Sequence, residues 1–598
     1  MQKNIQLSLV LVALTGSLYA NSAIELEPIT VTSATKTAQS IKDVTSNVNV
    51  ITSTEIEEKN YTTVTEALNS VSGISFTSNG GLGKATSVMV RGFDSKRVLV
   101  LIDGVRYNDV TGISGAPFEH LMISDIEQIE IVKGAQSGVW GADATAGVIN
   151  IITKDAKKGL HGFVSGEYGS FATTKYGASA SYKEDSYYIK ASSKKIDTNG
   201  FSAKAPKDED IDNFEKDGYR NTTSNIKFGF NINETNKVDI SHTIVNAHNE
   251  YDSGDANSYA ASRTNDSFTS INFNHIDSFN ELNVYVNKSK FDRNYSYGEY
   301  DGEVYEYGVK SNISYRENDF ILVGIDYKTF EHENNLQEKY DNKAIFITNN
   351  NEFGFAGKTI VTESLRFDTY NKFENKTTGK LGIKNLNNSV EGLVLSANIG
   401  TAYNVPTLYN LFSPYGSTTI TPEETLSCDL GIEYKNFKIT YFKSVISDMI
   451  DFDMTTYKYN NLKGDSKIKG LELEYNKAIA DDIVFGVNYT RLDARNNDSE
   501  VLARRAKQSL KASIDYYATT DLHIGLNGEY IGSRYNSDNL QGEQTGKYTV
   551  VNMVANYEIN KNLSMYAKID NLFDKYYQVV DGYATAPRSA YLGFKANF

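Results

Sequence analysis

Apolar and polar side chains alternate along most of the chain, from about residue 158 to residue 598. Ile226, Phe228 and Phe230 are separated by single polar or small residues, and residues 592–598 repeat the pattern at the end of the chain. A period of two places the apolar side chains on one face of a strand and the polar ones on the other. The polar face carries few charges, which favours a membrane barrel with lipid outside and a wet lumen inside. A soluble sandwich would have the same period but a more highly charged outer face.

Breaks rich in Asn, Asp and Gly separate these alternating segments. A long break such as residues 204–217 predicts an extracellular loop, and a short break predicts a periplasmic turn. A transmembrane strand needs about 9–11 residues, so the roughly 440 residues of this region can hold about twenty strands with half of the length left for loops. Alternation alone does not fix the number of strands. A barrel this wide has an open lumen unless another part of the chain fills it.

The pattern changes between residues 46 and 154, where apolar residues form short continuous runs. Val98–Ile102, Ile126–Val132 and Gly147–Thr153 predict three buried strands, each bounded by a turn or a glycine-containing loop. Residues 54–59 and 62–70 predict two short helices. This segment is too apolar to be a connecting loop, so we predict a small mixed α/β domain.

The start of the chain has a different character again. Residues 1–20 predict a secretory signal peptide, with Lys3 before an apolar run and Ala20 at the cleavage site. Elsewhere no apolar run approaches the roughly 18 residues of a transmembrane helix. Residues 21–45 form a polar arm that contains one β-prone stretch, which either adds as a strand to the sheet edge of a partner or belongs to a disordered, threonine-rich leader. The stretch comprises Leu26, Glu27, Pro28, Ile29, Thr30, Val31 and Thr32.

Composition narrows the functions that the chain can have. The formal net charge of −15 and the pI of about 5.1 argue against nucleic acid as a partner. The 44 Gly, 41 Tyr and 28 Phe residues against 7 Pro are typical of a β-rich protein. The single cysteine, Cys428, cannot form an internal disulfide. No nucleophile elbow, paired cysteine, zinc-binding histidine pair or phosphate-binding loop supports an enzyme, and no catalytic cofactor is expected.

Several motifs follow one another in a fixed order. They are Val-Arg-Gly-Phe at 90–93, Val-Leu-Val-Leu-Ile-Asp-Gly-Val at 98–105, Ile-Glu-Gln-Ile-Glu-Ile-Val-Lys-Gly at 126–134, Gly-Val-Ile-Asn-Ile-Ile-Thr at 147–153, Ala-Tyr-Asn-Val-Pro-Thr-Leu at 402–408 and Asn-Leu-Phe-Asp-Lys-Tyr-Tyr at 571–577. The first four resemble the plug domain of TonB-dependent outer-membrane receptors. The last two resemble barrel motifs of the same family, and the alternating strand that ends at Phe598 resembles its barrel-assembly signal.

The resemblance implies an all-β transmembrane barrel of about 22 antiparallel strands, with an N-terminal mixed α/β plug domain inside the lumen. The corresponding boundaries are 1–20 for the signal peptide, 21–45 for a periplasmic arm, 46–154 for the plug and 158–598 for the barrel. The protein is then expected to be a monomer that is integral to the bacterial outer membrane and surrounded by its lipid.

Residues 26–32 are similar to the TonB box of the family in position and in their Ile-Thr-Val-Thr core. The resemblance implies that TonB pairs with this segment and that the ExbB and ExbD proteins energise it. The expected function is therefore active transport of a scarce, large nutrient across the outer membrane. A passive porin or an adhesin would have no use for a plug or a TonB box.

The expected substrate is cobalamin or another corrinoid, because the short chain and one plug loop resemble cobalamin receptors of the family. A ferric siderophore or haem is the alternative. Haem needs an axial ligand, and His248 near a predicted loop keeps that alternative open. The expected substrate-binding residues lie in the plug loop and one barrel loop; they are Asn108, Asp109, Gly112, Ile113, Ser114, Gly115 and Tyr251.

Carboxylates are concentrated in residues 208–217 and 250–255. Ca²⁺ prefers six to eight hard oxygen ligands, although the first run lacks the glycine and glutamate positions of an EF-hand. The two runs resemble the calcium-ordered loops of cobalamin receptors at Asp217 and Asp252, and their other carboxylates are added as candidates. The expected Ca²⁺ ligands are Asp210, Asp212, Glu215, Asp217 and Asp252. The alternative is an ordinary solvated acidic loop.

Overall fold

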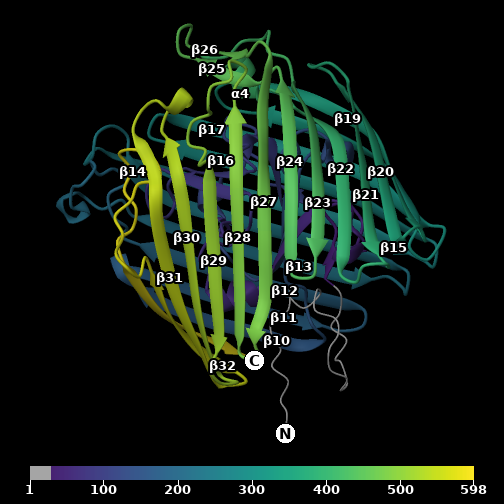
Figure 1. Cartoon of the computed structure of the whole chain (residues 1–598), viewed down its shortest axis with the longest axis horizontal. Helices are drawn as coiled ribbons and strands as arrows, with labels where there is room; N and C mark the ends of the chain where they lie inside the picture. Colours follow the sequence, from purple (N-terminus) through teal and green to yellow (C-terminus); the bar gives the residue numbers. More distant parts are fainter. Residues whose placement is uncertain (1–28) are drawn as a thin grey trace.

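The computed structural model describes residues 29–598, so the predicted signal peptide and Leu26, Glu27 and Pro28 of the predicted TonB box lie outside the described residues. The largest part is a closed barrel of 22 antiparallel strands, in which the last strand pairs with the first (Figure 1). The predicted fold class is therefore confirmed. The barrel strands are β10 (Gly159–Gly169), β11 (Thr173–Lys183), β12 (Tyr187–Thr198), β13 (Tyr219–Asn231), β14 (Asn236–Asp252), β15 (Tyr259–Ile276), β16 (Asn280–Tyr295), β17 (Gly298–Ser314), β18 (Phe320–His332), β19 (Glu338–Phe353), β20 (Gly357–Tyr370), β21 (Lys376–Asn387), β22 (Leu393–Asn404), β23 (Glu423–Tyr434), β24 (Phe437–Ser447), β27 (Asp465–Ala480), β28 (Ile483–Arg495), β29 (Gln508–Tyr517), β30 (Leu522–Tyr535), β31 (Gln544–Asn560), β32 (Leu563–Asp570) and β33 (Ser589–Asn597).

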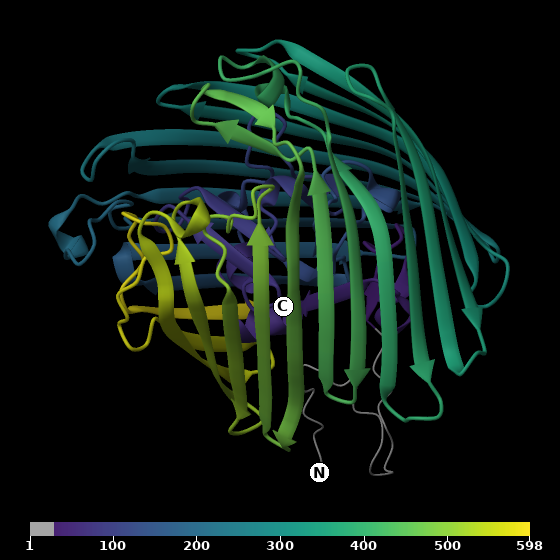
Figure 2. The same cartoon turned by 45° about the horizontal axis from the view of Figure 1, so that its top comes forward.

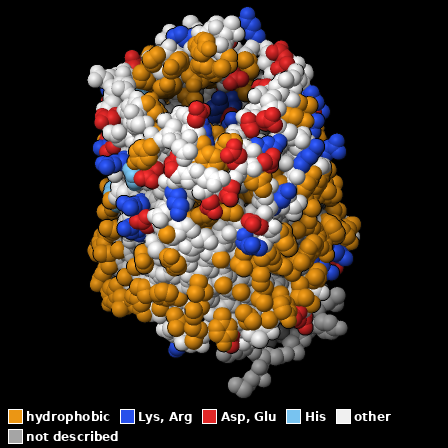
Figure 3. Space-filling view, turned by 90° about the vertical axis from the view of Figure 1, so that its left-hand side faces the viewer, with side chains coloured by type: hydrophobic (Ala, Val, Ile, Leu, Met, Phe, Trp, Pro, Cys, Tyr) orange, Lys and Arg blue, Asp and Glu red, His pale blue; other side chains and the backbone are white. Residues whose placement is uncertain are grey.

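The alternating pattern separates an apolar outer face from a polar lumen. On β13, Ile226 has 54% and Phe228 has 40% of its surface exposed, whereas Lys227 between them has 7%. Figure 3 shows hydrophobic side chains gathered in a broad belt around the lower half of the molecule. Exposed apolar side chains on the outside and covered polar ones inside are the arrangement that a lipid-facing barrel requires.

The two ends of the barrel have different connections. The end at which the chain enters β10, here called the turn end, has short turns such as residues 184–186. The opposite end, here called the loop end, has longer connections that include α4 (Leu408–Phe412) and the hairpin of β25 (Ile450–Asp453) and β26 (Lys458–Asn461) (Figure 1). Residues 204–217, predicted to form a long loop, lie at the loop end between β12 and β13.

The plug lies inside the barrel lumen, where Figures 1 and 2 show it surrounded by barrel strands. Its core is a five-stranded sheet in the order β3-β8-β9-β6-β7, accompanied by a separate β4–β5 hairpin. The plug strands are β3 (Asn47–Thr52), β4 (Ile74–Ser78), β5 (Thr86–Val90), β6 (Val98–Ile102), β7 (Val105–Arg106), β8 (Ile126–Lys133) and β9 (Gly147–Thr153). The three predicted plug strands are thus present. Every residue of β6 is buried, and its partner β9 runs parallel to it, which explains why its sequence is a continuous apolar run.

Two short helices stand where residues 54–59 and 62–70 predict them, although the second helix is shorter than expected. They are α1 (Ser53–Lys59) and α2 (Val64–Leu68). The Thr52 side chain accepts a hydrogen bond from the Glu55 N–H (3.3 Å), and Asn60 ends α1 in the left-handed region at φ 49°. A third helix, α3 (Ser137–Trp140), faces β19 to β22. Within residues 29–598, no helix combines the length and the apolar composition that crossing a bilayer requires.

The arm before the plug is more ordered than its irregular sequence predicts. Thr30–Val31 (β1) pairs with Gln39–Ser40 (β2), and Val31 is fully buried against apolar residues of the plug sheet. The described part of the arm therefore docks on the plug from Ile29 onward. The short 3-10 helices of the chain are η2 (Ile41–Asp43), η3 (Ser95–Arg97), η4 (Phe118–His120), η5 (Ser170–Ala172), η6 (Ile211–Asn213) and η7 (Asp538–Leu540).

Candidate functional site

A small cavity of about 40 Å³ lies between the plug and the barrel wall, near the loop end. The plug contributes the segment after β7, and the barrel contributes β18, β19 and the connection that contains α4. The plug residues that line it are Lys96, Arg106, Asn108, Asp109, Val110, Gly115 and Asp143. The barrel residues that line it are Phe330, Tyr340, Asn404, Val405, Thr407, Leu408, Asn410, Glu423 and Ile450. We call this space the apical cavity.

Three of the predicted substrate-binding residues, Asn108, Asp109 and Gly115, line the apical cavity, and the polar atoms of the first two hold the plug loop. The Asn108 side chain accepts a hydrogen bond from the Val100 N–H and donates one to the Val98 carbonyl, both at 2.8 Å. Asp109 pairs with Arg293 on β16 at 2.5 Å. Because these atoms are already engaged, Asn108 and Asp109 shape the floor of the cavity more than they offer free groups to a ligand.

The other predicted plug residues form the tip of the same loop. Ile113 and Ser114 are exposed, and Gly112 is half-buried. Gly115 has φ 76°, and a Cβ there would lie 2.5 Å from the Ser95 carbonyl oxygen, so a larger residue would displace the loop. The loop tip is therefore held at its base and open to solvent at Ile113 and Ser114.

Tyrosines from separate barrel loops meet at the loop end. The rings of Tyr295, Tyr297 and Tyr300, all in the β16–β17 hairpin, lie 5.1 to 6.1 Å apart between centroids. Burial raises the pKa of Tyr297 to about 12, with further contributions from the neighbouring Tyr251, Tyr300 and Tyr409. We call Tyr251, Tyr295, Tyr297, Tyr300 and Tyr409 the tyrosine mouth. Rings in this arrangement offer flat apolar faces with hydroxyl groups at their edges, which suits aromatic or planar ligands.

Sequence reasoning identified only Tyr251 among these residues. A local signal was available in residues 294–300, which read Asn-Tyr-Ser-Tyr-Gly-Glu-Tyr and bring three tyrosines into one hairpin. The approach of Tyr409, which belongs to α4 and is more than a hundred positions away, depends on how the barrel loops fold inward and leaves no trace in the local sequence.

His332 at the end of β18 is fully buried beside the tyrosine mouth. Its ring lies 6.4 Å from the ring of Tyr300, and neither ring nitrogen has a hydrogen-bond partner within the described part of the chain. Burying an imidazole whose two nitrogens have no partner costs free energy, unless another group forms a hydrogen bond with it. By contrast, His248, the histidine for which haem was retained as an alternative substrate, lies 3.8 Å from the Glu250 carboxylate.

Three of the five predicted Ca²⁺ ligands come together at the loop end. One side-chain oxygen each of Glu215, Asp217 and Asp252 lies within 4.8 Å of the others. Glu215 and Asp217 belong to the β12–β13 loop, and Asp252 is the last residue of β14. The other two predicted ligands are exposed and are not part of this group: Asp210 caps η6, and Asp212 lies within it.

The environment of this acidic group suits a hard cation. The Ala203 N–H donates to Asp217 (2.6 Å) and the Lys204 N–H donates to Asp252 (2.8 Å), but no donor from residues 29–598 reaches either carboxylate oxygen of Glu215. Burial raises the pKa of Asp217 to about 6, and the nearby Asp252 carboxylate raises it further. Burial also raises the pKa of Glu215. Ca²⁺ binds carboxylate oxygens and displaces any proton they carry. A group of carboxylates with raised pKa values is therefore suited to bind this ion.

A single plug carboxylate holds the docked arm at the other side of the plug sheet. Glu130 of β8 accepts hydrogen bonds from the Thr32 N–H (3.0 Å) and the Ser33 N–H (2.8 Å), and a further bond from the Ser33 hydroxyl. The Trp140 indole N–H donates to the Ser33 carbonyl (2.8 Å). Ile29, Thr30, Val31 and Thr32, the described residues of the predicted TonB box, thus lie against the plug in this state.

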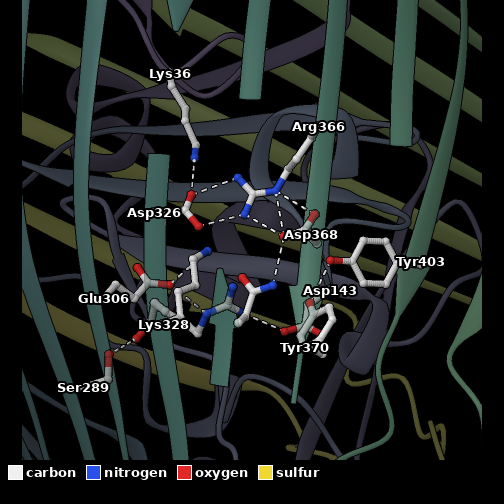
Figure 4. Close-up of polar contacts among 12 residues, drawn as sticks. Lys36, Asp143, Ser289, Glu306, Asp326, Lys328, Arg366, Asp368, Tyr370 and Tyr403 are labelled. Atoms are coloured by element: carbon white, nitrogen blue, oxygen red, sulfur yellow. Dashed lines mark hydrogen bonds and ion pairs between the residues drawn. The ribbon is translucent and has the colours of Figure 1, made fainter. Parts of the chain in front are cut away.

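Lys36 extends the arm contact to the barrel wall. Its ammonium group lies 3.6 Å from Asp326 of β18 (Figure 4). It also faces the rings of Trp140 and Phe346 at 4.8 and 4.2 Å. Arg366 of β20 in turn binds Asp326 (2.8 Å) and Asp368. Charges buried this deeply require such partners, because desolvation of an unpaired ion costs several kcal/mol.

The same face of the barrel wall carries ion pairs toward the apical cavity. Glu306 of β17 pairs with Lys328 (3.3 Å) and with Arg106 of the plug (3.4 Å), and Arg106 also binds Asp143 at 2.5 Å. Lys328 is two residues beyond Asp326 on β18. Arm, wall and cavity floor are therefore joined by adjacent charged groups. Sequence reasoning identified none of these residues because each pair joins distant segments.

A second buried network fixes the plug to the opposite part of the wall. Arg91 binds Glu472 of β27 at 3.0 Å, and Lys133 lies 3.4 Å from the same carboxylate. Glu472 is fully buried. Removing one partner from such a network leaves an uncompensated buried charge, so these residues hold the plug strongly in place.

Two known family patterns match this chain. The pattern described as "TonB dependent receptor-like, beta-barrel" matches residues 160–572, and the pattern described as "TonB-dependent Receptor Plug Domain" matches residues 40–148. The first alone covers more than half of the chain. The two matches correspond to the barrel and to the plug with its docked approach segment.

Solved structures with the same architecture cover nearly the whole chain. The siderophore receptor PirA from Acinetobacter baumannii has a TM-score of 0.79 at 17% identity, over 92% of this chain and 98% of its own. A mutant of the ferric enterobactin receptor PfeA from Pseudomonas aeruginosa has a TM-score of 0.78 at 18% identity, over 92% and 98%. The siderophore receptor PiuA from Acinetobacter baumannii has a TM-score of 0.76 at 16% identity, over 93% and 97%. Together, the plug inside a closed barrel and the two family patterns show that the chain belongs to the TonB-dependent receptors, a family of outer-membrane transport receptors.

Proposed function

We propose that this protein takes up a ferric siderophore or a similar metal chelate across the outer membrane, driven by TonB. The observation that carries the proposal is the placement of two sites on one plug. The apical cavity and tyrosine mouth lie toward the loop end, and the docked arm with Thr30–Val31 lies on the plug sheet. A ligand that binds on one side can therefore influence whether the arm is released on the other.

The proposed cycle begins with ligand binding under the tyrosine mouth. Binding shifts the plug loop and the adjoining Arg106–Glu306 pair, and the arm then leaves Glu130 and enters the periplasm. The released Thr30–Val31 segment pairs with TonB as an added strand, in place of its partner Gln39–Ser40. ExbB and ExbD supply the force through TonB, and one receptor molecule acts as a monomer.

The tyrosine mouth favours a siderophore as the substrate. Its rings can stack on the aromatic groups with which many iron chelators bind metal, and the buried His332 offers a free ring nitrogen beside them. The similar structures described above are siderophore receptors, although their low identity establishes only the fold.

A corrinoid is the second candidate, and the acidic group favours it. Glu215, Asp217 and Asp252 offer a Ca²⁺ ion three carboxylates beside the barrel mouth, and no group in the described part of the chain donates a hydrogen bond to the Glu215 oxygens. We propose that Ca²⁺ binds these three residues and orders the β12–β13 loop over the ligand. Asp210 and Asp212 lie outside this proposed site.

Titration of the purified, detergent-solubilised receptor distinguishes the two substrates. Ferric catecholate siderophore and cyanocobalamin are each added with Ca²⁺ and with a chelator of Ca²⁺, and binding is followed by the fluorescence of Trp140, the only tryptophan. Tight siderophore binding in both conditions supports the first candidate. Cyanocobalamin binding that requires Ca²⁺ supports the second and rejects the first.

A further inference from the structure

Three arginines lie close together at the loop end. Arg504 and Arg505 belong to the connection between β28 and β29, and Arg534 is near the end of β30. Burial lowers the pKa of Arg504, and the positive charges of Arg505 and Arg534 lower it further. The three guanidinium groups are therefore near enough to repel one another. We call Arg504, Arg505 and Arg534 the arginine cluster.

Arg534 is buried without a counter-charge. Only 2% of its surface is exposed, and its two Nη groups donate long hydrogen bonds, to the Phe76 carbonyl of the plug (3.5 Å) and to the Tyr548 hydroxyl (3.3 Å). Within residues 29–598 no carboxylate forms an ion pair with Arg534, and its Nε–H has no hydrogen-bond partner. A cation buried in this way costs free energy unless an anion reaches it.

The other two arginines are only partly neutralised. Arg505 lies 3.6 Å from a carboxylate oxygen of Asp94, whose other oxygen binds Arg97 at 2.7 Å. One carboxylate thus serves two arginines. The Arg504 Nε–H donates to the side-chain oxygen of Asn536 (3.0 Å), which is uncharged. The arginine cluster therefore holds more positive charge than its immediate partners cancel.

The acidic residues of the same connections are turned to other groups. Asp538 accepts a hydrogen bond from the Ala503 N–H, and Glu500 accepts hydrogen bonds from the Asn496 and Asn539 amides (3.2 and 3.0 Å). These carboxylates are thus engaged with backbone and amide donors instead of pairing with Arg504 or Arg534. The excess positive charge remains available to a ligand that brings its own negative charge.

A small pocket of about 10 Å³ lies beside two members of the cluster. Its polar lining residues are Arg505, Lys507, Ser533, Arg534, Tyr535 and Ser537. This volume is about that of one water-sized group, such as a single anionic oxygen. A guanidinium group offers a planar fork of N–H donors that matches negatively charged oxygens, and two such groups line this pocket. We call it the arginine pocket.

The arginine pocket adjoins the apical cavity across one plug segment, residues 92–96. On one side of this segment, the Gly92 carbonyl accepts a hydrogen bond from Arg505 (3.1 Å), and Asp94 pairs with the same arginine. On the other side, Lys96 lines the apical cavity and donates to the Ile450 carbonyl (3.2 Å), which belongs to another lining residue. A ligand held above this segment can therefore reach both spaces.

We propose that the arginine pocket binds a negatively charged oxygen group of the transported ligand, so that the substrate is an anionic chelate. This inference rests on the proposed function of energised uptake and decides between its two candidates. A ferric tris-catecholate is an anion, because its deprotonated catechol groups carry more charge than Fe³⁺ cancels, whereas cyanocobalamin is uncharged. The bound anion supplies the counter-charge that Arg534 lacks. It also replaces Asp94 at Arg505, while Asp94 keeps Arg97 as its partner.

Binding of charged and uncharged ligands to the purified, detergent-solubilised receptor tests this inference. The anionic probes are ferric tris-catecholate and ferric citrate, and the uncharged probes are a ferric trihydroxamate and cyanocobalamin. Each is titrated against wild type, Arg534→Gln and Arg504→Gln. The control is Arg495→Gln, because Arg495 has its own carboxylate partner in Asp493 (2.9 Å) and does not line the pocket.

Wild type is expected to bind at least one anionic chelate more tightly than either uncharged ligand. Arg534→Gln should weaken the binding of that chelate at least tenfold, and Arg504→Gln, which covers poor assembly of the more deeply buried variant, at least threefold. Any binding of uncharged ligand and the affinity of Arg495→Gln should stay within twofold of wild type. Tightest binding of an uncharged ligand, binding of none of the four, or an anionic affinity within twofold of wild type in both cluster variants would overturn the inference.

Uptake by cells with and without TonB separates this inference from the proposed function. TonB-dependent uptake of an uncharged ligand alone would overturn the arginine pocket as a substrate site and leave energised uptake standing. If cells take up none of the bound ligands in a TonB-dependent manner, the proposed function fails, and the binding comparison on the purified receptor still decides whether the arginine pocket holds an anion.

Discussion

Glu130 is the residue on which the docking of the arm converges, since its carboxylate accepts the backbone N–H groups of both Thr32 and Ser33. Glu130→Ala should therefore release the arm, because hydrogen bonds to a charged group are worth about 1.5–3 kcal/mol each. When the arm is released, Trp140 of the plug loses its contacts with Ser33 and Lys36. The fluorescence emission of Trp140 should then shift to longer wavelength, and trypsin should cut the arm after Lys36. The control is Glu127→Ala, an exposed glutamate on the same strand. Equal trypsin sensitivity of both variants would contradict this role.

Asp217 makes proposed Ca²⁺ binding depend on pH. Its pKa of about 6 is raised by burial, so below pH 6 the carboxyl carries a proton that a cation must displace, and above pH 6 it is free to bind. Ca²⁺ affinity should therefore rise between pH 5 and pH 7, by up to about tenfold per pH unit while Asp217 is titrating. Calorimetric titration of the purified receptor measures this.

Asp217→Asn should abolish that Ca²⁺ binding, whereas Asp210→Asn should leave it unchanged because Asp210 lies outside the acidic group. Ca²⁺ affinity that is independent of pH, or equal losses in the two variants, would show that the ion binds elsewhere.

Tyr297 and Tyr300 contribute two rings of the tyrosine mouth, which meet edge to face at 6.1 Å between centroids. The double substitution to alanine should weaken ligand binding by about tenfold, since aromatic pairs contribute roughly 0.5–1.5 kcal/mol each beyond the area they bury. Tyr176→Ala is the control, because this tyrosine points outward from β11 with 60% of its surface exposed. An unchanged dissociation constant for the double variant in equilibrium binding would place the ligand elsewhere.

Among the elements, the β8–β9 pair depends on a glycine. Gly147 has φ 150°, and a Cβ there would lie 2.1 Å from the Val132 carbonyl oxygen. Gly147→Ala should lower the free energy of plug unfolding by about 3 kcal/mol or more, because strain adds to a clash with backbone. Gly104→Ala is the matched control: φ is 81° but nothing lies within 4 Å, so the cost should be about 1 kcal/mol. Denaturant unfolding followed by Trp140 fluorescence measures both; similar midpoints would contradict the clash.

The sequence predicted elements well where one physical rule dominates. β6 and β9 were predicted to the residue because both faces of a plug strand are buried, which leaves a continuous apolar run. The arm was predicted as a polar segment with one β-prone stretch. Nothing in the local sequence shows that Val31 enters an apolar cluster or that Glu130, about a hundred residues later, accepts hydrogen bonds from Thr32 and Ser33. Glu215, Asp217 and Asp252 were predicted as ligands, but their separation from Asp210 and Asp212 depends on how the loop bends.

For the molecule as a whole, alternation predicted the barrel but not its contents. Each barrel strand must present apolar side chains to the lipid, so a short segment of sequence is enough to show the pattern. The contact of α3 with β19 to β22, the binding of Arg91 to Glu472 and the ion pairs from Lys36 to Arg106 are relations between distant segments. No local pattern encodes them, and the same holds for the approach of Tyr409 to the three tyrosines of residues 294–300.

Energised uptake through a docked arm is the central claim, and Val31→Pro tests it most directly. Proline removes the N–H that an added strand needs, so TonB can no longer pair with the segment, while the apical cavity is untouched. Ligand binding and uptake are measured side by side in cells, with Val31→Ala as the control. The account predicts that Val31→Pro binds ligand within twofold of wild type and takes it up no faster than cells that lack TonB. Uptake at the wild-type rate would contradict it.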